Sequence, residues 1–158
     1  MSTKGHRFKK IFFGTIDKFY ITQIIIPFAG HLTNKMSDYQ VLQLEKTDPV
    51  YGRLTNIDTL GKPEEELVIK ALQEGKVFLE LSGQIALYLM DNVPRVLQYL
   101  KARYTDIFID EYQDCGSVQH AVFMKMVKSG IRGIAVGDKD QAIFAFNLNY
   151  SPLCGESG

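Results

Sequence analysis

The stretch IFIDEYQD, residues 107–114, joins a continuous apolar run to a cluster of acids, and it decides the fold of this chain. An apolar run bounded in this way is typical of a central strand that is buried on both faces. A second apolar run, Ile134–Val136, ends in Gly137 and Asp138. Ser117 can cap a helix between the two runs, with Lys128 near its end and Gly130 as its stop. Strand, helix and strand in this order predict a parallel βαβ unit, whose binding residues lie at the carboxyl ends of the strands.

The rest of the chain predicts one more strand and several helices. Residues 11–13 form a short apolar run stopped by Gly14, which predicts a buried strand. The segment between residues 31 and 61 is mixed and polar, and it predicts loops with short irregular elements. Caps and apolar periodicity predict helices over residues 15–28 (ended by Pro27 and Gly30), 63–74, 82–91 and 94–103.

Length and composition exclude several classes of protein. The chain has 158 residues, a length that fits about one domain. Its formal net charge is zero, so no global basic field attracts it to DNA or to a membrane. Cys115 and Cys154 match no metal-ligand spacing and are too few for a disulfide scaffold. The longest apolar run, residues 24–29, is far shorter than the roughly 20 residues that span a bilayer. The basic N-terminus lacks the apolar core of a signal peptide, so the sequence predicts a cytoplasmic protein with no membrane partner.

The acids that follow the first strand are candidate metal ligands. Asp110, Glu111 and Asp114 place three carboxylates within five residues. Like charges at this density are costly unless they are solvated or paired with a cation. Mg²⁺ is a suitable cation because it accepts carboxylates together with phosphate oxygens. The alternative is a solvated acidic loop, and this cluster alone leaves both interpretations open.

The aromatic residues after the second strand are candidate nucleic-acid contacts. Phe144 and Phe146 lie two positions apart, so in an extended segment they share one face. Exposed rings in this arrangement can stack on bases, at roughly 1–3 kcal/mol per base. The alternative is that both rings belong to the core.

Together, IFIDEYQD and VGDKDQAIFAF (residues 136–146) closely resemble the UvrD/Rep/PcrA family of superfamily 1 DNA helicases. In that family they are the Walker B motif and the next helicase motif along. These motors have two RecA-like domains and move along single-stranded DNA, usually 3′ to 5′, driven by ATP. GTIDKF, residues 14–19, resembles the family's DNA-contacting GT(I/F)HSF motif and implies a DNA contact at Thr15. It departs from that motif at Asp17 and Lys18.

The resemblance implies a role for each site residue. Asp110 would hold the Mg²⁺ of Mg-ATP, and Glu111 would act as the general base for the attacking water. Gln141 would reach the γ-phosphate of ATP and report its presence to the DNA site. Phe144 and Phe146 would stack on the bases of single-stranded DNA.

The resemblance also implies a fold and its division. The expected class is α/β: a partial RecA-like P-loop NTPase domain, with a parallel sheet and flanking helices, that carries a mostly helical insertion. The ATPase domain would comprise residues 1–19 and 105–150, the insertion residues 20–104, and an unaligned tail residues 151–158.

One part of the ATP site is missing from these residues. A P-loop requires Gly-x-x-x-x-Gly-Lys followed by Ser or Thr. The Gly-Lys pairs at residues 61–62 and 75–76 are followed by Pro63 and Val77. The sequence therefore predicts an internal helicase fragment that is inactive alone for lack of a P-loop. Its partners would be single-stranded DNA and the rest of the helicase or a P-loop-bearing chain.

Two functions of other classes remain open. The chain is alternatively a single-stranded DNA-binding module that acts in trans with a P-loop-bearing partner. A metal-dependent hydrolase that uses Asp106 or Asp138 beside the acidic cluster is the third interpretation. The pathway, the polarity of translocation and the origin of so short a chain are left open.

Overall fold

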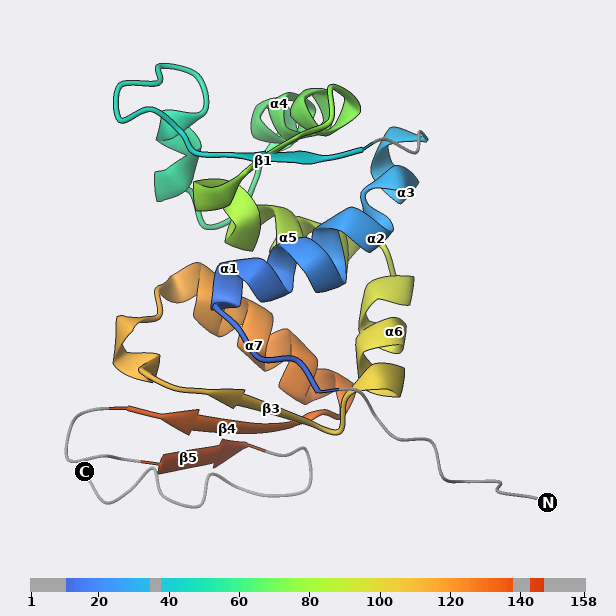
Figure 1. Ribbon diagram of the computed structural model, residues 1–158, viewed down its shortest axis with the longest axis vertical. Coiled ribbons are helices and arrows are strands. Elements are labelled where there is room, and N and C mark those ends of the chain that lie inside the picture. The colour runs from blue at the N-terminus through green and yellow to red at the C-terminus, as the bar shows by residue number, and fades with distance from the viewer. Residues whose placement is uncertain (1–10, 35–37, 138–142, 147–158) are drawn as a thin grey trace. The chain divides into compact units, whose positions relative to one another are not determined.

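A computed structural model describes residues 11–34, 38–137 and 143–146, the last of these for the backbone alone. The chain divides into two compact units. The sheet unit contains the described residues of Met1–Phe13, Leu97–Asp114 and Phe123–Gly158. The helical unit contains Gly14–Val96 and Cys115–Val122. Figure 1 labels the helices α1 to α7 and the strands β1, β3, β4 and β5, and each unit is described by itself.

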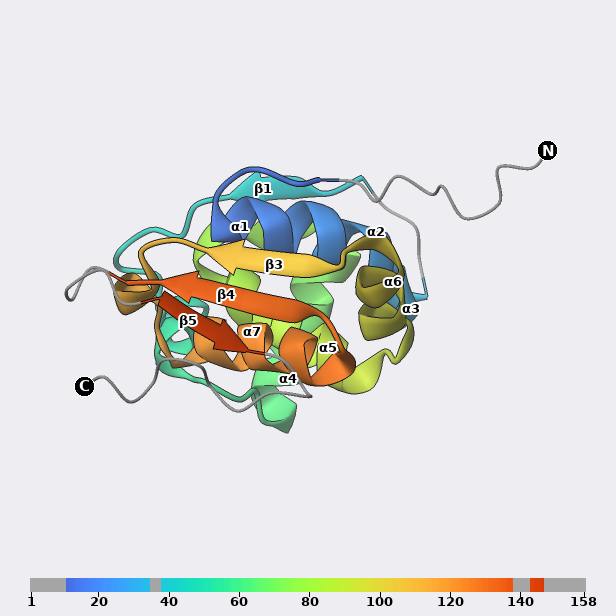
Figure 2. The ribbon, with the colours of Figure 1, turned by 90° about the horizontal axis from the view of Figure 1, so that it is seen from below.

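The sheet unit contains the predicted pair of parallel strands. Its three strands lie in the order β3, β4, β5, with bounds Asp106–Ile109, Arg132–Val136 and Ile143–Phe146. Strands β3 and β4 are parallel, with Phe108 opposite Ile134, and β5 is antiparallel to β4 (Figure 2). Helix α7, Ser117–Ser129, connects β3 to β4 and begins at the predicted cap. The predicted βαβ order is therefore confirmed, while the antiparallel β5 was not predicted. The prediction that residues 107–109 form a central strand buried on both faces is wrong for the described sheet, in which β3 is the edge strand and Phe108 is 62% exposed.

Packing of α7 on the sheet explains Gly133 in β4. Phe123 and Val127 are buried on α7 and lie directly over this glycine. A Cβ atom at Gly133 would come within 2.6 Å of the Phe123 ring and 2.7 Å of the Val127 side chain. The helix therefore approaches the strand more closely than any residue with a side chain permits. Ile109 and Ala135 are buried in the same unit.

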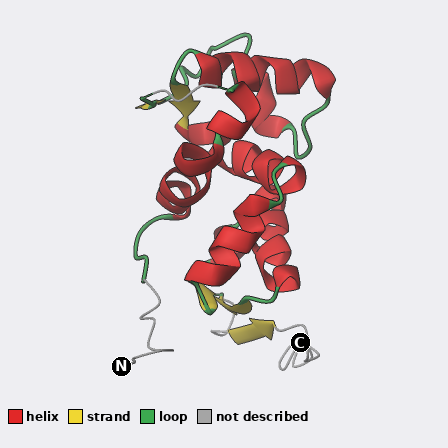
Figure 3. Cartoon of the chain, turned by 90° about the vertical axis from the view of Figure 1, so that its right-hand side faces the viewer, coloured by secondary structure: helices red, strands yellow, loops and turns green. Residues whose placement is uncertain are grey.

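Helices predominate in the helical unit (Figure 3). A continuous helical segment begins at Ile16 and contains a π-helical stretch, Tyr20–Ile25, before α2 and α3. The remaining helices confirm the predicted positions, and their bounds are close to the expected ones. The helices are α1 (Ile16–Phe19), α2 (Ile26–Phe28), α3 (Gly30–Thr33), α4 (Lys62–Gln73) and α5 (Ser82–Asn92), followed by α6 (Arg95–Arg103), which ends in the sheet unit.

The prediction that Pro27 and Gly30 end the first helix was wrong. Pro27 lies in the first turn of α2, and helical backbone continues to Thr33 before Asn34 adopts φ 55°. Inside a helix a proline lacks the N–H that would donate to the preceding turn, so it is tolerated where the regular hydrogen-bond ladder is already interrupted. The preceding π-helical stretch changes the hydrogen-bond register just before the proline. Asn34 ends the helix because asparagine tolerates the left-handed region.

The helical unit also contains a small parallel sheet that was not predicted. Strands β1 (Gln40–Leu42) and β2 (Lys76–Phe78) pair with Val41 opposite Val77. The backbone N–H of Gln40 donates to the Gly75 carbonyl, 2.7 Å away. Gly75 has φ 75°, and a Cβ atom there would lie 2.7 Å from the Asp38 carbonyl oxygen. Only glycine fits this close approach of two chain segments.

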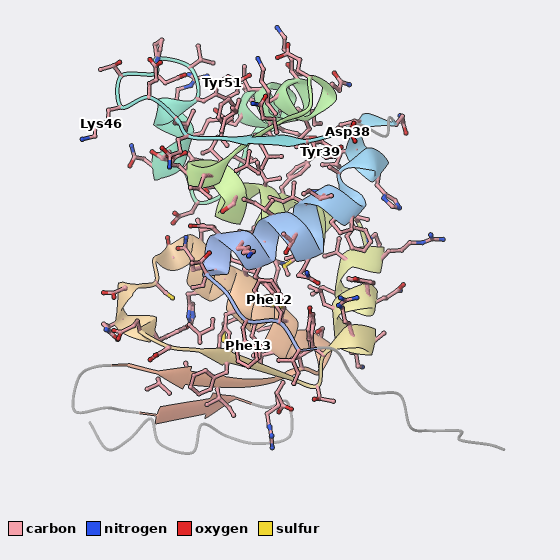
Figure 4. The ribbon with its side chains drawn as sticks, in the orientation of Figure 1. Phe12, Phe13, Asp38, Tyr39, Lys46 and Tyr51 are labelled. Carbon is pink, nitrogen blue, oxygen red and sulfur yellow. The ribbon has the colours of Figure 1, made fainter. Side chains whose placement is uncertain are left out.

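The predicted strand over residues 11–13 is not formed. Figure 4 shows Phe12 and Phe13 on an irregular segment that leads into α1. Ile11 is 78% exposed and Phe13 is 86% exposed, while Phe12 is half-buried. An apolar run becomes a buried strand only where a neighbouring strand and a covering layer receive it. Within the described residues, no helix has the length and apolar character that crossing a membrane requires.

Asp48 organises the loop that precedes a 3₁₀ turn, Gly52–Asn56. Its Oδ1 accepts backbone N–H bonds from Val50 at 2.9 Å, Tyr51 at 2.6 Å and Gly52 at 3.4 Å. The hydrogen bond from Tyr51 lowers the pKa of the Asp48 carboxyl. Tyr51, labelled in Figure 4, also packs its ring 4.6 Å from that of Phe78 in β2. The ionised form of Asp48 therefore holds this loop.

We expect this loop to depend on pH. Because the pKa of Asp48 is lower in the folded chain, its stabilisation is present above the usual aspartate pKa, roughly 3.9, and is lost as the pH falls through the lower folded value. The amide chemical shifts of Val50 and Tyr51 should move toward random-coil values on acidification. The substitution Asp48→Ala should cause the same change at neutral pH. Asp58→Ala, at an exposed position in the same segment, is the control. Unchanged amide resonances in Asp48→Ala would contradict this role.

Candidate active site at the carboxyl ends of two parallel strands

Asp110 and Glu111 follow directly after β3, at the carboxyl end predicted for the site. Both side chains are exposed. The Oδ1 atom of Asp110 accepts a hydrogen bond from the backbone N–H of Glu111 at 2.8 Å. Glu111 has φ 54°, and the N–H of Asp114 donates to its carbonyl at 2.9 Å. The chain therefore turns sharply at Glu111, in a conformation that costs a residue with a side chain about 1–2 kcal/mol.

The side chain of Gln113 lies between the ends of the two strands. Its Nε2 donates to Oε2 of Glu111 at 2.5 Å. On the other side, a Cβ atom built on Gly137 would lie 3.4 Å from Oε1 of Gln113. Gly137 follows β4, whose residue Ala135 is the register partner of Ile109 in β3. The structure therefore brings Glu111 and Gly137 together through a side chain that the sequence reasoning did not single out, although it lies within the quoted motif.

The acids suit a site in which the protein supplies few metal ligands. Within the described ranges, no three His, Cys, Asp or Glu side chains are arranged to hold a metal ion. Mg²⁺ commonly takes one or two carboxylates and completes its coordination with phosphate oxygens and water. Asp110 and Glu111, exposed at the strand end, fit that donor set. They do not fit a metal held by protein ligands alone.

Other predicted site residues are only partly described. Gln141 and Asp138 lie outside the described residues. Phe144 and Phe146 lie in β5, where the register sets them opposite Ala135 and Gly133. Their backbone is extended, as the prediction of a shared face requires.

Thr15 belongs to the helical unit, where it begins α1. Its Oγ1 accepts a hydrogen bond from the backbone N–H of Lys18 at 3.2 Å. Asp17, where the sequence departs from the helicase motif, accepts a hydrogen bond from the hydroxyl of Ser82 at 2.8 Å. Ser82 is 1% exposed. The unusual acid therefore satisfies a buried hydroxyl of α5, which is a structural use for this side chain.

Comparison with known proteins identifies the family. Residues 31–150 match the UvrD/REP helicase N-terminal domain. The chain belongs to this family. The match includes the acids after β3 and the segment after β4, so the resemblance predicted from these two motifs is confirmed.

Individual relatives of this domain carry the names of helicases or of a helicase/nuclease subunit. DNA helicase II of Escherichia coli (strain K12) is 28% identical over 99 residues, 58% of this chain and 14% of the relative. An ATP-dependent helicase/nuclease subunit of Natranaerobius thermophilus is 37% identical over 119 residues, 72% of this chain and 9% of the relative. ATP-dependent DNA helicase PcrA of Staphylococcus aureus (strain Mu50) is 36% identical over 59 residues, 37% of this chain and 8% of the relative. The chain thus matches only a small part of each relative. No solved structure matches it.

Proposed function

We propose that this UvrD-like domain forms the acidic half of the ATP-hydrolysis site, and part of the DNA-contacting surface, of an ATP-dependent DNA helicase. The observation that carries the proposal is the position of Asp110 and Glu111 at the end of β3, beside the end of β4 at Gly137. Family membership and the names of the relatives support it. In this proposal, residues 1–19 and 105–150 belong to a RecA-like ATPase domain, and residues 20–104 form its insertion.

Asp110 would hold Mg²⁺ through its water shell, and Glu111 would orient and deprotonate the water that attacks the γ-phosphate. Phosphoryl transfer depends mostly on positioning and electrostatics, and Mg²⁺, when bound, neutralises charge on the phosphates. Exposure of both carboxylates leaves them accessible to a nucleotide. The hydrogen bond from Gln113 limits the rotamers of Glu111, which supports a role that requires a defined direction.

The DNA-facing residues would be Phe144, Phe146 and Thr15, with Gln141 as the sensor of the γ-phosphate. Gln141 precedes the two aromatic residues in one short segment. A shift of this segment when the γ-phosphate leaves would therefore be passed to the bases stacked on the aromatic rings. The DNA in this proposal is single-stranded, because stacking requires unpaired bases.

ATP hydrolysis would also require a phosphate-binding loop that these 158 residues do not encode. Without the amides and lysine of that loop, the β- and γ-phosphates have no cradle. The chain alone is therefore expected neither to hydrolyse ATP nor to unwind DNA. Because it has the candidate DNA-binding segment without this loop, the second candidate function is a single-stranded DNA-binding module that acts in trans with a P-loop-bearing partner.

The test is to read the coding DNA on both sides of this frame and to assay ATPase activity. The motor proposal expects an encoded P-loop upstream and further helicase motifs downstream. It also expects DNA-stimulated ATPase from the complete product, but none from these 158 residues alone. Flanking DNA that encodes neither would reject the motor and leave the module in trans, which retains single-stranded DNA binding that falls in Phe144→Ala and Phe146→Ala. If the 158-residue chain alone showed DNA-stimulated ATPase activity that Glu111→Gln abolished, the claim that hydrolysis requires a separate P-loop would be rejected.

A further inference from the structure

Four cations belong to the segments that lead into β3 and β4 in the sheet unit: the end of α6, the end of α7 and the first residue of β4. Arg132 is the first residue of β4, and its Nε lies 2.5 Å from Oδ1 of Asp106, the first residue of β3. The side chain of Lys101, near the end of α6, covers the turn after α7, where a Cβ atom on Gly130 would lie 3.2 Å from its Nζ. We name this group of side chains the basic corner: Lys101, Arg103, Lys128 and Arg132.

Among the described residues, one carboxylate forms an ion pair with the basic corner. Asp106 pairs with Arg132. Across the described part of the chain, no carboxylate forms an ion pair with Lys101, Arg103 or Lys128. The whole chain has no net charge, so this excess is a local feature and not a general property of the surface.

Arg103 is held in place by two neutral partners. Its Nη1 donates to the hydroxyl of Tyr99 at 2.9 Å, and its Nε donates to the hydroxyl of Tyr104 at 3.2 Å. Its guanidinium carbon lies 5.6 Å and 5.8 Å from the centroids of the same two rings. The hydrogen bond to Tyr104 raises the pKa of the guanidinium, which stays charged. The two bonds leave other N–H donors of Arg103 for a ligand, and the tyrosines reduce the entropy lost on binding.

We propose that the basic corner is a second contact surface for single-stranded nucleic acid, in which Arg103 binds a backbone phosphate between two tyrosine rings. This goes beyond the proposed function, because the basic corner lies at the opposite ends of β3 and β4 from Asp110 and Gly137. A guanidinium matches the geometry of a phosphate and can donate two hydrogen bonds to it. Lys101, Lys128 and Arg132 would add charge for neighbouring phosphates.

Nucleic acid fits the basic corner better than an acidic peptide does. The rings of Tyr99 and Tyr104 flank the cation, and aromatic rings beside cations are the usual means of holding unpaired bases and their backbone together. A peptide carboxylate uses the cation but has no base to place against the rings. Both tyrosines are half-buried residues, so neither is enclosed in the core.

The experiment measures binding of the 158-residue chain to a fluorescent oligothymidine of about 20 nucleotides, by anisotropy, at about 50 to 200 mM salt. We expect Arg103→Ala to raise Kd roughly threefold to tenfold at low salt and to reduce the slope of log K against log salt by about 0.7 for each phosphate that is no longer neutralised. Arg103→Lys keeps the charge but cannot donate two parallel hydrogen bonds to one phosphate, and its Kd should lie between those of the wild type and the alanine variant. Arg53→Ala, an exposed arginine of the helical unit, is the charge-matched control and should change Kd little.

Further variants separate this site from the Phe144/Phe146 platform. Joint replacement of Tyr99 and Tyr104 by phenylalanine keeps the rings but frees Arg103, and should weaken binding. Phe146→Ala should weaken binding without changing the salt slope, because stacking releases few counterions. An effect of Phe146→Ala without any effect of Arg103→Ala would overturn the basic corner and leave the platform. Equal effects of Arg103→Ala and Arg53→Ala, or stronger binding of an oligoglutamate than of the oligonucleotide, would also overturn it.

Discussion

Replacing Glu111 by glutamine is expected to lower the kcat of DNA-stimulated ATP hydrolysis roughly 10²- to 10⁴-fold in a protein that also supplies the phosphate-binding loop. Glutamine has nearly the same shape as glutamate but cannot accept a proton from the attacking water. The left-handed backbone at this position is no worse for glutamine than for glutamate. Steady-state ATPase rates at saturating DNA measure the effect, with KM for ATP nearly unchanged if binding is retained.

Glu66→Gln is a matched control because it removes the same charge from an exposed position on α4. It should leave kcat unchanged. DNA affinity should remain close to wild type in both variants, since neither residue is placed in the DNA-contacting surface. A Glu111→Gln protein that hydrolyses ATP at the wild-type rate would reject the assignment of the general base, and the acids after β3 would then need another role.

Replacing Phe123 by alanine is expected to destabilise the chain by about 3–5 kcal/mol, the largest expected effect on folding. Phe123 is 0% exposed and fills the space above Gly133, which has no side chain of its own. Its ring also lies 5.6 Å from that of Tyr112, in the turn that follows the acids. Removing the ring leaves a cavity between α7 and β4 that glycine cannot fill. Urea unfolding followed by circular dichroism measures the loss.

Phe108→Ala provides the comparison within the same unit. Phe108 lies on β3 but is 62% exposed, so its replacement should change stability by no more than about 0.5 kcal/mol. Both variants remove the same phenyl ring, in one case from a fully buried position and in the other from an exposed one. Equal losses in both would show that α7 does not cover the strands as described, and would contradict the role of Gly133 as the point of close approach.

The helices that were predicted correctly are specified by residues within or next to each helix. Ser117 begins α7 as expected, and Pro63 lies in the first turn of α4. Caps, prolines and apolar periodicity act over one or two turns, so they can be read from the residues themselves. The helix through Pro27 was misjudged because the π-helical stretch before it changes the hydrogen-bond register.

The strands show where local signals are insufficient. Apolar character predicted β3 and β4 correctly, but it also predicted a strand at residues 11–13 that is not formed. The small β1–β2 sheet was missed because its register joins Gln40 to Lys76, and such pairing has no local signature. A strand exists only with its partner, and the partner is selected by the fold.

The same division applies to the site. From the sequence alone, the acids at residues 110 and 111 could be placed after a strand, since chain order sets which residues leave its carboxyl end. The family resemblance also followed from the motifs alone. Only the tertiary structure decided that Gln113 reaches from Glu111 toward Gly137, and that Asp17 bonds to Ser82. Sequence determines which groups are available at short range, whereas contacts between distant segments depend on packing, which sets distances that no local pattern encodes.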